Sequence, residues 1–226
     1  MSAMNNSAGT TARLLWAGLR ALLVLTVLTG VVYPLAVTGI AQAAFPAKAN
    51  GSEIKSEGKV AGSSLIGQSY TLPLKKGQDT PAPDLRWFQP RPSNGLGTNS
   101  VNPQYQLILS GATNRSGDNK ELIQWVKEAK AAVVKDNSTP KYRVSPSDVP
   151  ADAVTSSASG LDPDISPRYA KLQVHRIAER NGLDVRRVDE LVSAHTDSRI
   201  LGFMGEPRVN VLELNVALRE LVGKGS

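Results

Sequence analysis

A long run without any charged side chain, Ala21–Ala47, is the feature that most constrains how this chain folds. A helix needs about 20 predominantly apolar residues to cross the hydrocarbon core of a bilayer, and this run exceeds that length. The sequence therefore predicts three regions: an N-terminal tail over residues 1–20, a single transmembrane helix over residues 21–44, and one globular domain over residues 45–226.

A cleaved signal peptide is the competing interpretation of the same segment. Arg13 and Arg20 would form its charged region, and the tripeptide 41–43 (Ala-Gln-Ala) fits the small-residue pattern of a cleavage site. The apolar region of a signal peptide is about 7–15 residues long, which is much shorter than this run. The length favours a permanent membrane helix.

Three residues within the run indicate a helix that packs against protein. Thr26 and Gly30 form a small-xxx-small pair, which lets a second helix approach closely. Pro34 removes one backbone donor, so a carbonyl about one turn earlier needs another partner inside the membrane. We expect Thr26, Gly30 and Pro34 to form a packing surface, with a plain lipid-facing anchor as the alternative.

The positive charges beside the helix do not decide its orientation. Arg13 and Arg20 lie on one side, and Lys48, Lys55 and Lys59 lie close to the other end. Long domains cross membranes largely regardless of such charges. These charges therefore allow the arrangement that we expect in a bacterial cell membrane, with the N-terminal tail (residues 1–20) in the cytoplasm and the domain (residues 45–226) extracytoplasmic.

Charge and cysteine content exclude several function classes. The net charge is +6, but the 26 Lys and Arg are interspersed with 20 Asp and Glu and do not alternate with aromatic residues. This pattern does not predict a nucleic-acid platform. The chain has no cysteine, which excludes disulfides, thiolate metal sites and a cysteine nucleophile.

The first part of the soluble domain reads as short strands joined by long loops. Residues 46–103 are rich in Gly, Ser, Pro and Asn, with strand candidates at Lys59–Ile66 and Gln68–Leu74. The segment Trp87–Ser93 places two prolines beside two aromatic residues and an arginine. It can be neither a central strand nor a helix, so we expect an ordered or recognition loop.

The second part is predicted to be mostly helical. Apolar spacing indicates an amphipathic helix over Asp118–Asp136. Three further helices begin at cap-like residues, namely Ser166, Asp184 and Asn210, and the first of them ends at Asn181-Gly182. The fold class expected for the domain is therefore α+β, with a small sheet against three or four helices.

No motif predicts a catalytic residue or a metal site. Asp162 and Asp164 could pair as acid and base or as metal ligands, but their positions beside a proline and a helix start favour turn and cap roles. His175 and His195 lack metal-ligand spacing, and His195 is expected to be a semi-buried structural residue. A phosphate-binding loop and a G-x-S-x-G elbow are both missing from the sequence, so autonomous ATP hydrolysis is excluded.

Gln173 is the most informative polar residue of the helical part. Its position puts an amide on a face otherwise formed by Ala170, Val174, Ile177 and Ala178. A buried amide needs hydrogen-bond partners. Gln173 therefore either ties a neighbouring loop to the core, which we favour, or contacts a bound molecule.

Five blocks in order along the chain resemble the C subunit of the bacterial Kdp potassium-transporting P-type ATPase. They are TGVVYPLAVTGIAQAAFPAKANGS at Thr29–Ser52, WFQPRPS at Trp87–Ser93, VPADAVTSSASGLDPDISP at Val149–Pro167, QVHRIA at Gln173–Ala178, and HTDSRILGFMGEPRVNVLELNVAL at His195–Leu218. The strings GLDPDISP and GEPRVNVLELN are long and unusual. The segment Ser110–Asp118 departs from the family's glycine-rich block, so a family role for that loop is not carried over.

The resemblance implies a non-catalytic subunit that assists assembly of a high-affinity potassium uptake complex. Its partners would be a potassium-translocating subunit (KdpA), an ATP-hydrolysing subunit (KdpB) and a small membrane peptide (KdpF). The family is described as a catalytic chaperone that raises the ATP affinity of the hydrolysing subunit, and Gln173 matches a glutamine implicated in that effect. ATP would then be bound only together with the hydrolysing subunit.

A domain outside the membrane is out of reach of cytoplasmic ATP, so this coupling would have to pass through the membrane subunits. Two other classes remain open at this point. One is an anchored extracytoplasmic hydrolase, and the other is a binding protein released from a signal peptide.

Overall fold

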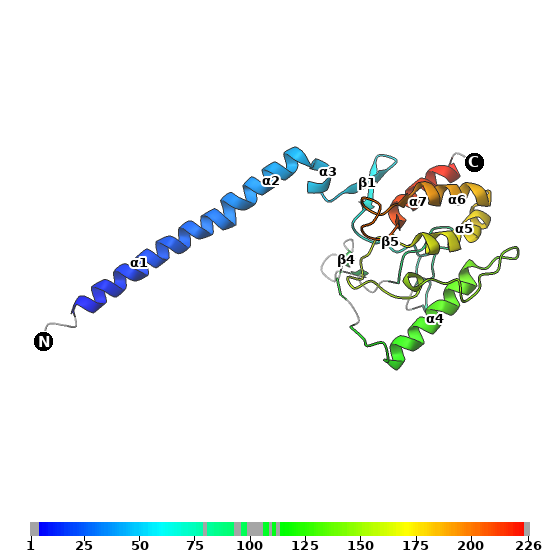
Figure 1. Ribbon diagram of the computed structural model, residues 1–226, viewed down its shortest axis with the longest axis horizontal. Helices are drawn as coiled ribbons and strands as arrows, with labels where there is room; N and C mark the ends of the chain where they lie inside the picture. The colour runs from blue at the N-terminus through cyan, green and yellow to red at the C-terminus, as the bar shows by residue number, and fades with distance from the viewer. Residues whose placement is uncertain are drawn as a thin grey trace. The chain divides into compact units, whose positions relative to one another are not determined.

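The computed structural model describes residues 5–78, 81–92, 96–98, 106–108, 110–111 and 114–223 (Figure 1). Of the segments singled out above, Ser93, Ala112 and Thr113 lie outside these residues. The chain forms two compact units, Met1–Ser52 and Glu53–Ser226.

The first unit is a long apolar helix that ends in a short helical turn. Its elements are α1 (Asn5–Val27), the π-helical turn η1 (Leu28–Val32), α2 (Tyr33–Ala44) and α3 (Pro46–Ala49). In the described part of the chain, one helix is long and apolar enough to cross a membrane, the 36 residues Gly9–Ala44. The predicted membrane helix is confirmed as a candidate span, and helix also extends through residues 5–20.

The expected disturbance at Pro34 takes the form of a π-turn. The N–H of Tyr33 donates to the carbonyl of Leu28, five residues back, and not to Thr29 as in an α-helix. Pro34 has no N–H to donate to Gly30. The carbonyl groups of Thr29 and Gly30 are therefore left without their usual helical donors, within the run that is apolar enough to lie in a membrane.

The second unit contains small antiparallel sheets. In the described residues, β1 (Glu53–Ser56) pairs with β2 (Lys59–Ser63), β3 (Leu96–Thr98) pairs with β4 (Gln106–Ile108), and a three-stranded sheet has the order β5 (Asp164–Ile165), β7 (Arg208–Asn210), β6 (Thr196–Asp197). The strand predicted at Lys59–Ile66 is present but ends at Ser63. The strand predicted at Gln68–Leu74 is wrong, because only Thr71 makes a single bridge, with Pro83.

The helices of the second unit are α4 (Lys120–Asn137), α5 (Pro167–Asn181), α6 (Val185–Ala194) and α7 (Val211–Gly223), with a 3₁₀ turn η2 at Ala151–Ala153. The predicted caps are confirmed. Ser166 accepts a hydrogen bond from the N–H of Tyr169, and Asp184 accepts one from Arg186. The Oδ1 of Asn210 lies 3.2 Å from the N–H of Glu213. The α+β class is confirmed, with four α-helices and small sheets among the described residues of this unit.

The core of this unit is centred on α5, which packs against α4, α6 and β7. The predicted apolar face of α5 is confirmed, because all its members are buried. Ile177 of α5, Val188 of α6, and Leu214 and Leu218 of α7 are completely buried. Phe88 is also completely buried, so the loop that follows Trp87 enters the core directly.

Candidate functional site

The segment Leu85–Pro92, called here the clamped loop, is held by polar side chains buried in the core. Gln173 in α5 makes the first clamp. Its Oε1 accepts the N–H of Gln89 at 2.7 Å, and its Nε2 donates to the Gln89 carbonyl at 3.1 Å. The Gln173 side chain is completely buried. The interpretation of Gln173 as a residue that ties a loop to the core is confirmed.

Asn215 in α7 makes a second clamp from another helix. Its Oδ1 accepts the N–H of Phe88 at 2.9 Å, and its Nδ2 donates to the Phe88 carbonyl at 3.0 Å. Two side-chain amides therefore satisfy both backbone groups of two consecutive residues, as two strands, one on each edge of an extended segment, would.

Arg176 completes the network as a buried cation. Its Nε donates to Asn137 at 2.8 Å, and its Nη2 donates to the Oε1 of Gln173 at 2.6 Å. Its Nη1 donates to the carbonyls of Leu85 and Trp87. Burial lowers the pKa of Arg176 to about 10, so the guanidinium remains charged at neutral pH. One side chain thus joins α4, α5 and the clamped loop.

The clamped loop is also tied to the turn around Asp162. The Nη1 of Arg91 lies 2.9 Å from the Oδ2 of Asp162, and the other carboxylate oxygen accepts the N–H of Asp164 at 3.0 Å. This is an Asx-turn, which confirms the turn role expected of Asp162. A Cβ at Gly67 would lie 2.7 Å from the Asp162 carbonyl, so only glycine permits this close approach.

Asp164 joins the same turn to the C-terminal motif. Its Oδ2 lies 3.2 Å from Nε of Arg208, and its Oδ1 lies 3.3 Å from Nδ2 of Asn210. Burial raises the pKa of Asp164, and this outweighs the lowering by Arg208. Asn210 also donates to the carbonyl of Ser64 at 2.8 Å. The structure thus brings WFQPRP, GLDPDISP and GEPRVNVLELN to one place, although they are far apart in sequence.

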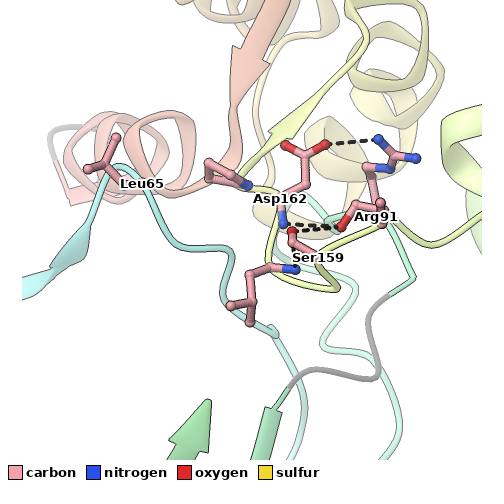
Figure 2. A pocket seen from close by; sticks show the side chains of 8 residues that line it. Leu65, Arg91, Ser159 and Asp162 are labelled. Atoms are coloured by element: carbon pink, nitrogen blue, oxygen red, sulfur yellow. Dashed lines mark hydrogen bonds and ion pairs between the residues drawn. The ribbon is translucent and has the colours of Figure 1, made fainter. Parts of the chain in front are cut away.

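A pocket of about 620 Å³ lies beside this turn (Figure 2). It is lined by Leu65, Arg91, Ser157, Ala158, Ser159, Leu161, Asp162 and Pro163. Figure 2 shows the side chains of Arg91 and Asp162 directed at each other. The lining includes the hydroxyls of Ser157 and Ser159, but no histidine is among these eight residues and the Asp162 carboxylate is paired with Arg91. The described lining therefore does not present a serine beside a free general base.

The histidines lie outside this pocket. His175 stacks on Tyr142 with ring centroids 3.8 Å apart. His195 is half-buried at the end of α6 and its Nδ1 lies 2.9 Å from the carbonyl of Leu191, which confirms the structural role expected of it. Among the described residues, no group of three or more His, Asp or Glu side chains is placed to hold a metal ion.

Thr26, Gly30 and Pro34 lie in the first unit, on the helix around η1. A Cβ added at Gly30 would meet no atom within 4 Å outside the helix's own backbone. The packing of the chain itself therefore does not require glycine at this position. Gln173 belongs to the second unit, so these residues and Gln173 form separate candidate sites.

Sequence reasoning missed Arg176 and Asn215. Both lie on helix faces that are otherwise buried, as Gln173 does. The signal was the same, a polar residue within an apolar helical face. The signal at Arg176 is weak because arginine is common on exposed helix faces.

In the described residues, these features define a class: a protein with one candidate membrane helix and an α+β domain in which the buried side chains of Gln173, Arg176 and Asn215 hold the domain's own loop. The chain matches the family model of the K⁺-transporting ATPase c chain, KdpC, over residues 15–220. It therefore belongs to the KdpC family, the non-catalytic accessory subunits of the Kdp potassium-transporting ATPase.

Similar proteins cover nearly the whole chain. The potassium-transporting ATPase KdpC subunit of Streptomyces avermitilis is 77% identical over 219 residues, which are 97% of this chain and 99% of that protein. The subunit of Streptomyces coelicolor is 73% identical over 223 residues, 99% of each chain. The subunit of Mycobacterium bovis is 43% identical over 209 residues, 92% of this chain and 99% of the relative.

Proposed function

We propose that this subunit assists assembly of the pump and raises the ATP affinity of its ATP-hydrolysing subunit without contacting the nucleotide. Its partners are that subunit, the potassium-translocating subunit and the small membrane peptide. The observation that carries this proposal is the complete burial of Gln173, with its amide bonded to the backbone of Gln89.

Direct contact between Gln173 and ATP would require the core to open. The carboxamide oxygen already accepts hydrogen bonds from Gln89 and Arg176, and the amide nitrogen donates to Gln89. An ATP molecule would have to replace these bonds, and leaving buried polar groups unpaired costs about 1–3 kcal/mol each. Gln173 is better explained as a positioning residue for the clamped loop, which then acts on neighbouring subunits.

The test compares the two clamps in the assembled pump. If the loop is the acting element, Gln173→Ala and Asn215→Ala should both raise the ATP concentration at half-maximal activity, although the Asn215 side chain bonds to Phe88 and not to Gln89. Arg186→Ala, an exposed residue of α6, is the matched control. An effect of Gln173→Ala without any effect of Asn215→Ala would contradict the proposal.

Calorimetry on the isolated chain supplies the second measurement. We expect no ATP binding in the micromolar range, because the sequence contains no phosphate-binding loop. Micromolar binding that disappears in Gln173→Ala would establish direct contact and overturn the positioning role.

The membrane helix is proposed to pack against the membrane subunits through Thr26, Gly30 and Pro34. Gly30 leaves open space at the helix surface, and small residues allow close backbone approach in lipid. Pro34 cannot donate the usual helical hydrogen bond to the Gly30 carbonyl, and a donor on a neighbouring helix would replace it.

The domain is proposed to lie outside the cell membrane, with the N-terminus in the cytoplasm. The chain contains no cysteine, so a cysteine introduced at one position is the only thiol of this chain that a maleimide can label. In spheroplasts, an impermeant maleimide should label Leu74→Cys on the exposed surface of the domain. It should label Gly9→Cys only after permeabilisation. The reverse pattern would place the domain inside.

A further inference from the structure

The connection between β6 and β7 carries a cluster of exposed apolar side chains. Ile200, Leu201, Phe203 and Met204 are exposed to 61%, 80%, 71% and 50%. We call Ile200–Met204 the apolar loop. Aliphatic and aromatic side chains gathered at one tip mark an interaction site, because soluble surfaces rarely group them.

The apolar loop is held in a defined conformation. Backbone hydrogen bonds run in both directions between Ile200 and Met204, at 2.9 and 3.0 Å. Arg199 and Glu206 form an ion pair of 2.9 Å at its base. Leu201 has a positive φ of 54°, a conformation that is costly for a leucine. The folded backbone therefore holds these apolar side chains at the surface of the domain.

The apolar loop is connected to the point where the chain enters the domain. Glu53, the first residue of β1, pairs with Ser63 at the end of β2. The next residue, Ser64, accepts a hydrogen bond from Asn210. Asn210 ends β7 (Arg208–Asn210), and the apolar loop leads into that strand from its other end.

The chain enters the domain eight residues after the candidate membrane helix. That helix ends at Ala44, and residues 45–52, which include α3, lead to the start of β1 at Glu53. Eight extended residues span at most about 29 Å, so the covalent connection limits the distance between the helix end and the entry point. This limit holds on whichever side of the membrane the domain lies.

We propose that the apolar loop inserts into the interfacial region of the bilayer that the chain's own N-terminal helix crosses. Leucine, isoleucine, methionine and phenylalanine suit the boundary between headgroups and acyl chains. The apolar loop carries no charged residue, and Arg199 at its base is neutralised by Glu206. Insertion of the apolar loop therefore requires no charged group to leave water, and it gives the domain a second attachment to the membrane.

The test uses the full chain alone, reconstituted at one copy per lipid nanodisc of neutral lipid, with a nitroxide on a single cysteine. Leu201→Cys probes the apolar loop. Leu74→Cys is the matched control, a leucine exposed to 59% in another loop of the domain. Collision with oxygen, which concentrates in lipid, is compared with collision with a water-soluble nickel chelate.

The nitroxide at position 201 should collide more with oxygen and less with the chelate, and that at position 74 should show the reverse. Equal access to the chelate at the two positions would overturn the proposal. Protection of position 201 that appears only when the other pump subunits are present would assign the loop to a protein contact instead. Co-purification of those subunits tests the proposed assembly role independently of this result.

Discussion

The side chain of Asn215 pairs with both backbone groups of Phe88, accepting from the N–H at 2.9 Å and donating to the carbonyl at 3.0 Å. Both residues are buried, so water cannot replace these bonds.

Asn215→Ala should therefore lower the free energy of unfolding by about 2–4 kcal/mol, because a buried donor and acceptor are left unpaired. Denaturant unfolding followed by tryptophan fluorescence measures this. Asn181→Ala is the control, since Asn181 donates to the carbonyl of Arg86 in a more exposed place. An equal effect of the two substitutions would contradict the clamp.

Arg176 should not tolerate replacement by lysine. The guanidinium donates to four oxygens in different directions, which a single ammonium group cannot reach together. We expect Arg176→Lys to cost about 3 kcal/mol of stability. Arg180→Lys, on the exposed side of the same helix, should change stability little. A stable Arg176→Lys variant would show that the fork geometry is unimportant.

Acid should weaken the ion pair between Asp84, which directly precedes the clamped loop, and Arg86 within that loop. Its carboxylate accepts two hydrogen bonds from the Arg86 guanidinium, at 3.0 and 2.7 Å, and this lowers the pKa of Asp84. A depressed carboxyl pKa contributes stability that is present above the unfolded value of about 3.9 and is lost as pH falls through the folded pKa.

Stability measured between pH 6 and pH 2 should therefore fall less steeply in Asp84→Asn than in the wild-type chain. Because the Arg86 side chain is well exposed, solvent screening keeps the difference small. Identical slopes would mean that other carboxyl groups cause the acid sensitivity.

Gly30→Leu should loosen the complex while leaving the domain folded. A Cβ at this position meets no atom within 4 Å outside the helix's own backbone, so a loss of recovery points to contacts with other subunits. The matched control is Gly39→Leu, where a Cβ is equally unobstructed. Gly39 is nine residues further on, about two and a half turns, and so faces another direction.

Recovery of the potassium-translocating and ATP-hydrolysing subunits with each tagged variant measures the effect. We expect reduced recovery with Gly30→Leu and normal recovery with Gly39→Leu. Equal recovery would mean that the helix serves only as an anchor.

The features predicted correctly from sequence are the local ones. The long uncharged run predicted the candidate membrane helix, and cap residues such as Ser166 and Asp184 marked where helices begin. Apolar spacing predicted which face of α5 is buried. Each of these signals lies within one continuous segment of the sequence, so it can be read without knowledge of the fold.

The strands were predicted poorly for a physical reason. β5 and β6 have two residues each and β7 has three, which is too short for an alternating pattern to be visible. Their pairing depends on residues far apart in sequence, such as Asp164 and Asn210. The segment Gln68–Leu74 had strand-like composition, but a strand forms only where a partner offers consecutive hydrogen bonds.

The sequence by itself determined that the chain has one membrane-length apolar helix, an α+β domain and no motif for ATP hydrolysis. It also marked Gln173 as a polar residue on a buried face. Only the tertiary structure decided what Gln173 contacts, because Gln89 is 84 residues away and reaches it through the packing of α5 against the clamped loop. The joint role of Arg176 and Asn215 was likewise decided by folding, since hydrogen bonds between distant segments leave no periodic trace in a sequence.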